Sequence, residues 1–171
     1  SDDINRAADL ILKSQKPMVL AGAGIIGSGA TLELVTLAER FGIPVATTLA
    51  GKGAFPEGHP LALGLGALSR ARYNTKQAVY CADHADVVLA IGAGFRQQAT
   101  KGFSPLPPGK KIIQVDVDPS EFNKSYMTDV AVLGDAKLVL EDLLEALGPK
   151  EKHTFWGGLE GLKKEIAGLR K

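Results

Sequence analysis

The sequence lacks the features that mark several large classes of protein. Its single cysteine, Cys81, excludes an internal disulfide framework and a multi-cysteine metal site. Basic and acidic residues number 20 and 19, so the basic excess that favours nucleic acid or an anionic membrane surface is missing. No apolar run reaches the roughly 20 residues of a membrane span, and no signal-peptide pattern opens the chain. We therefore expect a soluble, cytoplasmic protein.

The reactive side chains also lack the spacing that catalysis or metal binding requires. The histidines are isolated from one another, which leaves a zinc site unsupported, and we interpret His59 as a turn residue. Ser28 does not fit a nucleophile elbow, because Ile26 stands where the first glycine of that motif belongs. Cys81 has no identifiable base and is typical of a small core residue. The sequence therefore predicts no catalytic residue and no metal ligand.

Glycine, by contrast, is plentiful at 20 residues, and it separates short apolar runs from stretches with helical periodicity. Short runs in which nearly every residue is apolar are typical of strands that are covered on both faces in a parallel sheet. The expected strands are 17–21, 43–48, 61–65, 87–91, 111–115 and 130–133. The expected helices are 4–12, 29–41, 70–83, one that begins after 135, and one after 154. This alternation predicts a three-layer α/β domain with a six-stranded, mostly parallel sheet and helices on both faces.

Several residues are expected to begin or end these helices. Ser28 is positioned to cap the helix over 29–41, and Gly42 to end it. Asp135 is expected to cap the helix that follows the last strand. We treat 1–171 as a single domain in which 150–171 forms a C-terminal helical extension.

The residues just after the strands mark the expected binding edge, because ligands of parallel sheets bind outside the carboxyl ends of the strands. Glycines gather at this edge, where they leave room for a ligand to approach the backbone. Tight turns and close helix packing are the alternative explanation for them. The three pairs are Gly22 with Gly24, Gly64 with Gly66, and Gly92 with Gly94.

Residues 22–27 match the dinucleotide fingerprint G-x-G-x-x-G, placed after a strand and before a helix. That fingerprint also expects an acidic residue about 20 positions later, at the end of the second strand. Here the second strand ends in Thr47-Thr48-Leu49-Ala50, and Glu39 lies inside the preceding helix. The missing acid weighs against a standard NAD site, whereas a phosphate at the helix N-terminus stays open.

Asp116 and Asp118 flank Val117 at the end of the fifth strand, where an extended chain points both side chains the same way. In one interpretation, they accept hydrogen bonds from ribose hydroxyls or an adenine amine. In the other, Asp118 starts a turn and caps a short helix with Pro119 and Ser120. The sequence leaves both interpretations open.

The order and spacing of these residues resemble the central domain of thiamine-diphosphate-dependent decarboxylases and carboligases, the acetolactate synthase and pyruvate decarboxylase group. The resemblance runs from about residue 4 to residue 147, and its most specific part is the loop 51–60 followed by Gly64. The matching segments are 22–24, 44–53, 56–64, 85–92, 114–119 and 134–135. The resemblance implies a Rossmann-like nucleotide-binding fold of the type shared with sirtuins.

The resemblance also implies an excised middle domain of a three-domain enzyme, whose N-terminal and C-terminal domains carry catalysis. The magnesium motif of the C-terminal domain is missing, because Ala136 follows Gly134-Asp135 and no asparagine occurs after Asn123. Thiamine diphosphate and magnesium are therefore expected in the parent enzyme and not on this chain. The parent would be a transferase or lyase that assembles as a homodimer or tetramer.

In some members of this family the central domain holds FAD, whereas other members bind ADP or no nucleotide there. The positions expected to bind such a cofactor are Gly22, Ala23, Gly24, Thr48, Leu49, Gly64, Gly66, Gly92, Asp116 and Asp118. The chain departs from the synthases at 66–69 and 94–98, and both departures weigh against a flavin. We expect a non-catalytic spacer with a cleft for FAD or ADP. The alternative is a free-standing domain that binds an adenine nucleotide such as NAD or ADP.

Overall fold

The computed structural model describes residues 1–66, 73–94, 109–124, 126–149 and 154–170. Six strands form one sheet in the order β3-β2-β1-β4-β5-β6, and every neighbouring pair is parallel. The strands are β1 (Pro17–Ala21), β2 (Val45–Thr47), β3 (Ala62–Leu65), β4 (Val87–Ile91), β5 (Lys111–Asp116) and β6 (Val130–Leu133). The predicted parallel α/β fold is confirmed. From β1 the chain adds β2 and β3 on one side of the sheet and then β4, β5 and β6 on the other. Such sheets bind ligands where the strand order reverses in this way, here between β1 and β4.

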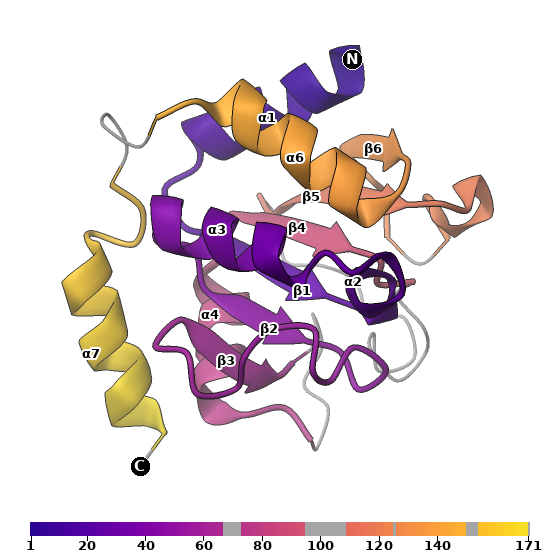
Figure 1. Ribbon diagram of the computed structural model, residues 1–171. Helices are drawn as coiled ribbons and strands as arrows, with labels where there is room; N and C mark the ends of the chain where they lie inside the picture. Colours follow the sequence, from indigo (N-terminus) through magenta and orange to yellow (C-terminus); the bar gives the residue numbers. More distant parts are fainter. Residues whose placement is uncertain (67–72, 95–108, 125, 150–153, 171) are drawn as a thin grey trace.

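Helices cover both faces of the sheet, as Figure 1 shows. On one face α1 (Asp2–Lys13), α3 (Thr31–Phe41) and α6 (Ala136–Leu147) pack together, with the short α2 (Ala23–Ser28) against α6. The other side carries α4 (Lys76–His84) and α7 (Leu159–Leu169), which contact each other. Because both faces are covered, β1 and β4 are buried along their whole length, which explains their uniformly apolar sequence. No helix in the described ranges is long and apolar enough to span a bilayer.

The stretch between β1 and α3 differs from the prediction. Residues 23–28, for which no helix was expected, form α2, which Gly29 ends in the left-handed conformation at φ 67°. Ser28 therefore does not cap α3. Its hydroxyl donates instead to the carbonyl of Gly24 at 2.9 Å, one turn back within α2, and α3 begins at Thr31. A serine inside a helix can donate its hydroxyl hydrogen bond to the backbone carbonyl one turn earlier in the same helix.

The other helix ends follow local chemistry. Gly42 ends α3 at φ 69°, as predicted, and Asp135 caps α6 by accepting from the amides of Lys137 and Leu138 at 3.1 and 3.2 Å. The helix predicted over 70–83 begins, within the described residues, at Lys76 behind a Thr75 cap. Residues 67–72 lie outside the described part of the chain.

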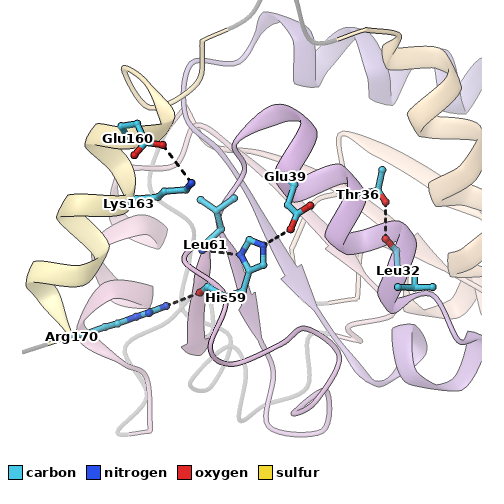
Figure 2. A network of polar contacts seen from close by, with 8 residues as sticks. All are labelled: Leu32, Thr36, Glu39, His59, Leu61, Glu160, Lys163 and Arg170. Atoms are coloured by element: carbon cyan, nitrogen blue, oxygen red, sulfur yellow. Dashed lines mark hydrogen bonds and ion pairs between the residues drawn. The ribbon is translucent and has the colours of Figure 1, made fainter.

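The C-terminal extension is anchored to the body of the fold from 154 onward, while 150–153 are not described. Leu162 and Ile166 of α7 are each 1% exposed, and the indole of Trp156 donates to the carbonyl of Pro17 at 2.7 Å. Arg170 donates to the carbonyl of His59 at 3.1 Å (Figure 2). It also donates to the carbonyl of Ala62. These contacts join α7 to the starts of β1 and β3.

Candidate functional site

A cleft of about 390 Å³ opens at the carboxyl ends of β1, β4, β5 and β6. Its volume lies within the range of small-molecule pockets, and its place matches the reversal point of the strand order. The residues that line it come from α2, from the last two residues of β5 and from the chain just after β4, β5 and β6. They are Gly24, Gly27, Ser28, Gly92, Val115, Asp116, Val117, Gly134, Asp135 and Ala136.

Two glycine turns contact each other beside this cleft, and Gly24 and Gly92 of these turns line it. A Cβ atom on Gly22 would lie 2.2 Å from the carbonyl oxygen of Gly92, and one on Gly24 would lie 2.7 Å from the Cα of Gly92. Gly92 itself adopts φ 59°, which side chains rarely tolerate. The turn after β1 therefore packs backbone to backbone against the turn after β4. Close packing is the first reason for these three glycines.

This packing also occupies the amides at the start of α2. The amide of Gly24 donates to the carbonyl of Gly92 at 3.2 Å, and that of Ile25 donates to the carbonyl of Gly22 at 3.2 Å. A dinucleotide fingerprint holds a pyrophosphate on such amides when they are free. In this chain the protein's own carbonyls already accept from them, so the match of 22–27 to the fingerprint does not bring its usual phosphate site.

The two aspartates after β5 have different roles. Asp118 caps a 3-10 turn, η1 (Pro119–Glu121), and accepts from the hydroxyl and amide of Ser120 at 2.7 and 2.9 Å. These two bonds lower the pKa of Asp118. Asp116 lines the cleft, where its Oδ1 accepts from the amide of Asp118 at 3.0 Å. The capping interpretation therefore holds for Asp118, whereas binding by Asp116 stays a prediction.

The predicted positions near β2 and β3 do not line this cleft. Thr48 accepts from the amide of Gly51 through its hydroxyl at 3.0 Å, and Leu49 is exposed. A Cβ on Gly66 would lie 2.9 Å from those of Ala46 and Ala78, so this glycine allows α4 to approach the sheet. A Cβ on Gly64, at φ 78°, would lie 2.9 Å from a methyl carbon of Thr75. Ala23 is the first residue of α2 and does not line the cleft either.

The lining also includes positions outside the set that the sequence analysis expected to bind the cofactor. Gly27 and Ser28 reach the cleft because the stretch after β1 coils into α2, which no local signal announced. Gly134 and Asp135 follow β6 at the same edge, so their position after a strand was a usable signal. The described lining contains carboxylates and no basic side chain.

The reactive side chains elsewhere are held in structural contacts. His59 accepts from the amide of Leu61 through Nδ1 at 3.0 Å, and its Nε2 lies 2.9 Å from Glu39 Oε1 (Figure 2). Burial, together with the charge of Glu165, raises the pKa of the Cys81 thiol to about 12. No group of three or more potential metal-ligating side chains occurs within the described residues. Residues 95–108, which include most of the departure at 94–98, are not described.

Comparison with known proteins places this fold in a family. Residues 4–143 match the family model described as thiamine pyrophosphate enzyme, central domain. The chain is 46% identical over 164 residues to a probable acetolactate synthase large subunit of Methanocaldococcus jannaschii, covering 94% of this chain and 27% of that protein. It is 35% identical over 170 residues to an acetolactate synthase of Mycobacterium bovis, covering 96% and 27% respectively.

A solved structure shares the same architecture. Benzoylformate decarboxylase from Polynucleobacter necessarius matches with a TM-score of 0.71 and 27% identity, over 89% of this chain and 28% of that one. The chain spans about a quarter of the length of the curated relatives it matches. Sequence and architecture agree in showing that the chain belongs to the family of thiamine pyrophosphate enzyme central domains.

Proposed function

We propose that this chain is the non-catalytic central domain of a longer, thiamine-diphosphate-dependent transferase or lyase that acts on 2-oxo acids, as its acetolactate synthase relatives' name suggests. One observation, in two parts, carries the proposal. Residues 4–143 match the model of the family's central domain, and the chain spans only about a quarter of the length of its relatives. In this proposal, N-terminal and C-terminal domains hold thiamine diphosphate and magnesium, and the parent assembles as a homodimer or tetramer. The buried Cys81 thiol and the bonded ring of His59 support a scaffold role.

The cleft at the carboxyl edge supports a second part of the proposal, a bound adenine nucleotide, FAD or ADP. Asp116 supplies an acceptor there. Among the described residues, only the amide of Asp118 donates to this carboxylate, and it does so at Oδ1. Oδ2 can therefore accept from a ribose hydroxyl or adenine amine. A Cβ on Gly27 would meet nothing within 4 Å, so a ligand can approach that backbone. Because the described lining holds carboxylates and no cation, it suits the adenosine end of the nucleotide better than its phosphates. Bound there, the nucleotide would order the edge without taking part in the reaction.

The experiment compares the 171-residue chain with the polypeptide encoded by its natural reading frame. Both are assayed with pyruvate, thiamine diphosphate and magnesium. We expect pyruvate consumption that requires thiamine diphosphate from the longer polypeptide and none from the chain alone. Turnover by the chain alone, or no thiamine-diphosphate-dependent turnover of any 2-oxo acid by the longer polypeptide, contradicts the proposal. Titration of FAD, ADP and NAD by calorimetry tests the nucleotide separately.

A further inference from the structure

Large apolar side chains are exposed along one edge of the sheet. Among the described residues, seven such side chains are strongly exposed. Six of them lie at the end of a strand, in the loop or short helix after it, or in the first turn of the next helix. Met127, which precedes β6, is the exception. We call the other six the apolar rim; they are Ile26, Leu32, Leu49, Val117, Leu133 and Leu138, and they are between 49% and 77% exposed.

The fold gathers these residues from distant parts of the sequence. All six strands point the same way, and α2 and the first turns of α3 and α6 lie on the side to which they point (Figure 1). Leu32 and Leu138 sit in those first turns, next to Glu33 and Lys137, whose ion pair of 3.8 Å joins the two helices. Val117 both lines the cleft and belongs to the rim. Exposed apolar side chains that lie together are typical of docking sites, and Leu32 and Leu138 lie on two helices that pack against each other.

The charges on this edge argue against a second copy of the chain as the occupant. Asp116 and Asp118 flank Val117 of the rim in the sequence, and Asp118 is exposed. A two-fold contact through the same edge would bring these carboxylates toward their own copies, and like charges at an interface are unfavourable. The described cleft lining, which includes Asp116, adds no cation, and the charge of Lys124 acts on Asp118.

The length of the relatives points to a different occupant. The chain accounts for about a quarter of each of the matched acetolactate synthases, so most of each relative is polypeptide outside this domain. We propose that the apolar rim is the surface on which a further domain of the same polypeptide docks, with apolar and basic groups facing it. The inference rests on the proposed function, because it requires the longer polypeptide. A domain docked there also covers the mouth of the cleft at Val117.

Single cysteines in the longer polypeptide test this inference. Leu32→Cys and Leu138→Cys place a thiol on the rim outside the cleft lining, so a bound nucleotide does not cover them directly. Arg40→Cys and Glu145→Cys are matched controls, because they are exposed positions near the opposite ends of the same two helices. Native Cys81 is buried and stays silent. Labelling with a maleimide is followed peptide by peptide in the mass spectrometer.

We expect the rim thiols to react at least about tenfold more slowly than their controls, at every protein concentration. Equal rates for rim and control thiols overturn the inference. Protection that disappears on dilution assigns the rim to a second copy and also overturns it. If the rim thiols react as fast as their controls in a polypeptide that turns over a 2-oxo acid, this inference is contradicted and the proposed function is not. If the rim thiols are protected in a polypeptide that has no thiamine-diphosphate-dependent activity, the proposed function is contradicted and this inference is not.

Discussion

Gly24 and Gly27 lie in the same short helix, α2, yet their surroundings are opposite. A Cβ on Gly24 would lie 2.7 Å from the Cα of Gly92, whereas one on Gly27 would meet nothing within 4 Å. The atoms that a Cβ on Gly24 would meet belong to the backbone of Gly92, which cannot move aside as a flexible side chain does. Position 24 therefore excludes any side chain. The two glycines look equivalent in the fingerprint pattern, and only their neighbours distinguish them.

Alanine substitutions at these two positions should therefore have opposite effects on stability. We expect Gly24→Ala to lower the free energy of unfolding by about 2 kcal/mol or more, because the new methyl forces the turns after β1 and β4 apart. Gly27→Ala should raise it by roughly 0.5–1 kcal/mol, since alanine favours the helix. Urea denaturation followed by circular dichroism measures both. Equal effects would show that the two turns do not need their close contact.

Asp116 is the residue on which the nucleotide proposal depends most directly. We expect Asp116→Ala to weaken ADP binding about tenfold or more, because a hydrogen bond to a charged acceptor contributes about 1.5–3 kcal/mol. Asp142→Ala, at an exposed position of α6, removes the same charge away from the cleft and serves as the control. Calorimetric titration of ADP gives both affinities. An unchanged affinity in Asp116→Ala would limit this residue to its bond with the amide of Asp118.

At the scale of elements, Asp86 joins the α1–β1 turn to the start of β4. Its carboxylate accepts from the hydroxyl of Ser14 at 2.5 Å and from the amides of Gln15 and Lys16 at 2.8 and 3.0 Å. Burial by itself raises the pKa of Asp86, but the hydrogen bonds outweigh it and lower the pKa below its ordinary value. The carboxylate form is thus the one that the fold stabilises.

This lowered pKa fixes the sign of a pH dependence. The contribution of Asp86 is complete above the unfolded pKa of about 3.9 and is lost as the pH falls through the lower folded pKa. We expect Asp86→Asn to lower the free energy of unfolding by about 1.5–3 kcal/mol at neutral pH. The difference from the parent chain should shrink below pH 4, as urea titrations at several pH values would show. Asp9→Asn, exposed on α1, is the control, and a pH-independent difference would contradict the assignment.

Most elements were predictable because their signals are local. The apolar run of β1 has the predicted limits, and Gly42 and Asp135 act where the capping rules place them. The expected strand 43–48 is shorter, because only Val45–Thr47 pair with neighbouring strands. The short helix α2 was missed because glycine is a poor helix former, and here packing against Gly92 and α6 holds the turn.

On the scale of the whole molecule, Cys81 reports on the integrity of the fold. Its side chain is buried, and burial raises the pKa of its thiol to about 12, so the reactive thiolate is absent from the folded chain near neutral pH. It lies on α4, which contacts α7, and Glu165 of α7 is the main cause that raises the pKa of Tyr80 on α4 to about 12. Opening of α7 should therefore expose the thiol.

We expect a thiol reagent to modify Cys81 only as the whole chain unfolds. Across a urea series, the modified fraction should follow the circular dichroism transition with the same midpoint. Asp9→Cys in a Cys81→Ala background should react at once without urea, because position 9 is exposed. Modification at lower urea than the dichroism midpoint would mean that α7 detaches before the sheet unfolds.

The sequence by itself determined the class of fold, the parallel sheet and the edge at which the cleft opens, because apolar periodicity and the spacing of glycines are properties of consecutive residues. It did not determine which residues meet at that edge. Gly24 contacts Gly92 because β1 lies beside β4 in the sheet, and Asp116 reaches the cleft while Asp118 caps a turn. Such contacts join segments far apart in the chain, so only the tertiary packing of the strands decides them.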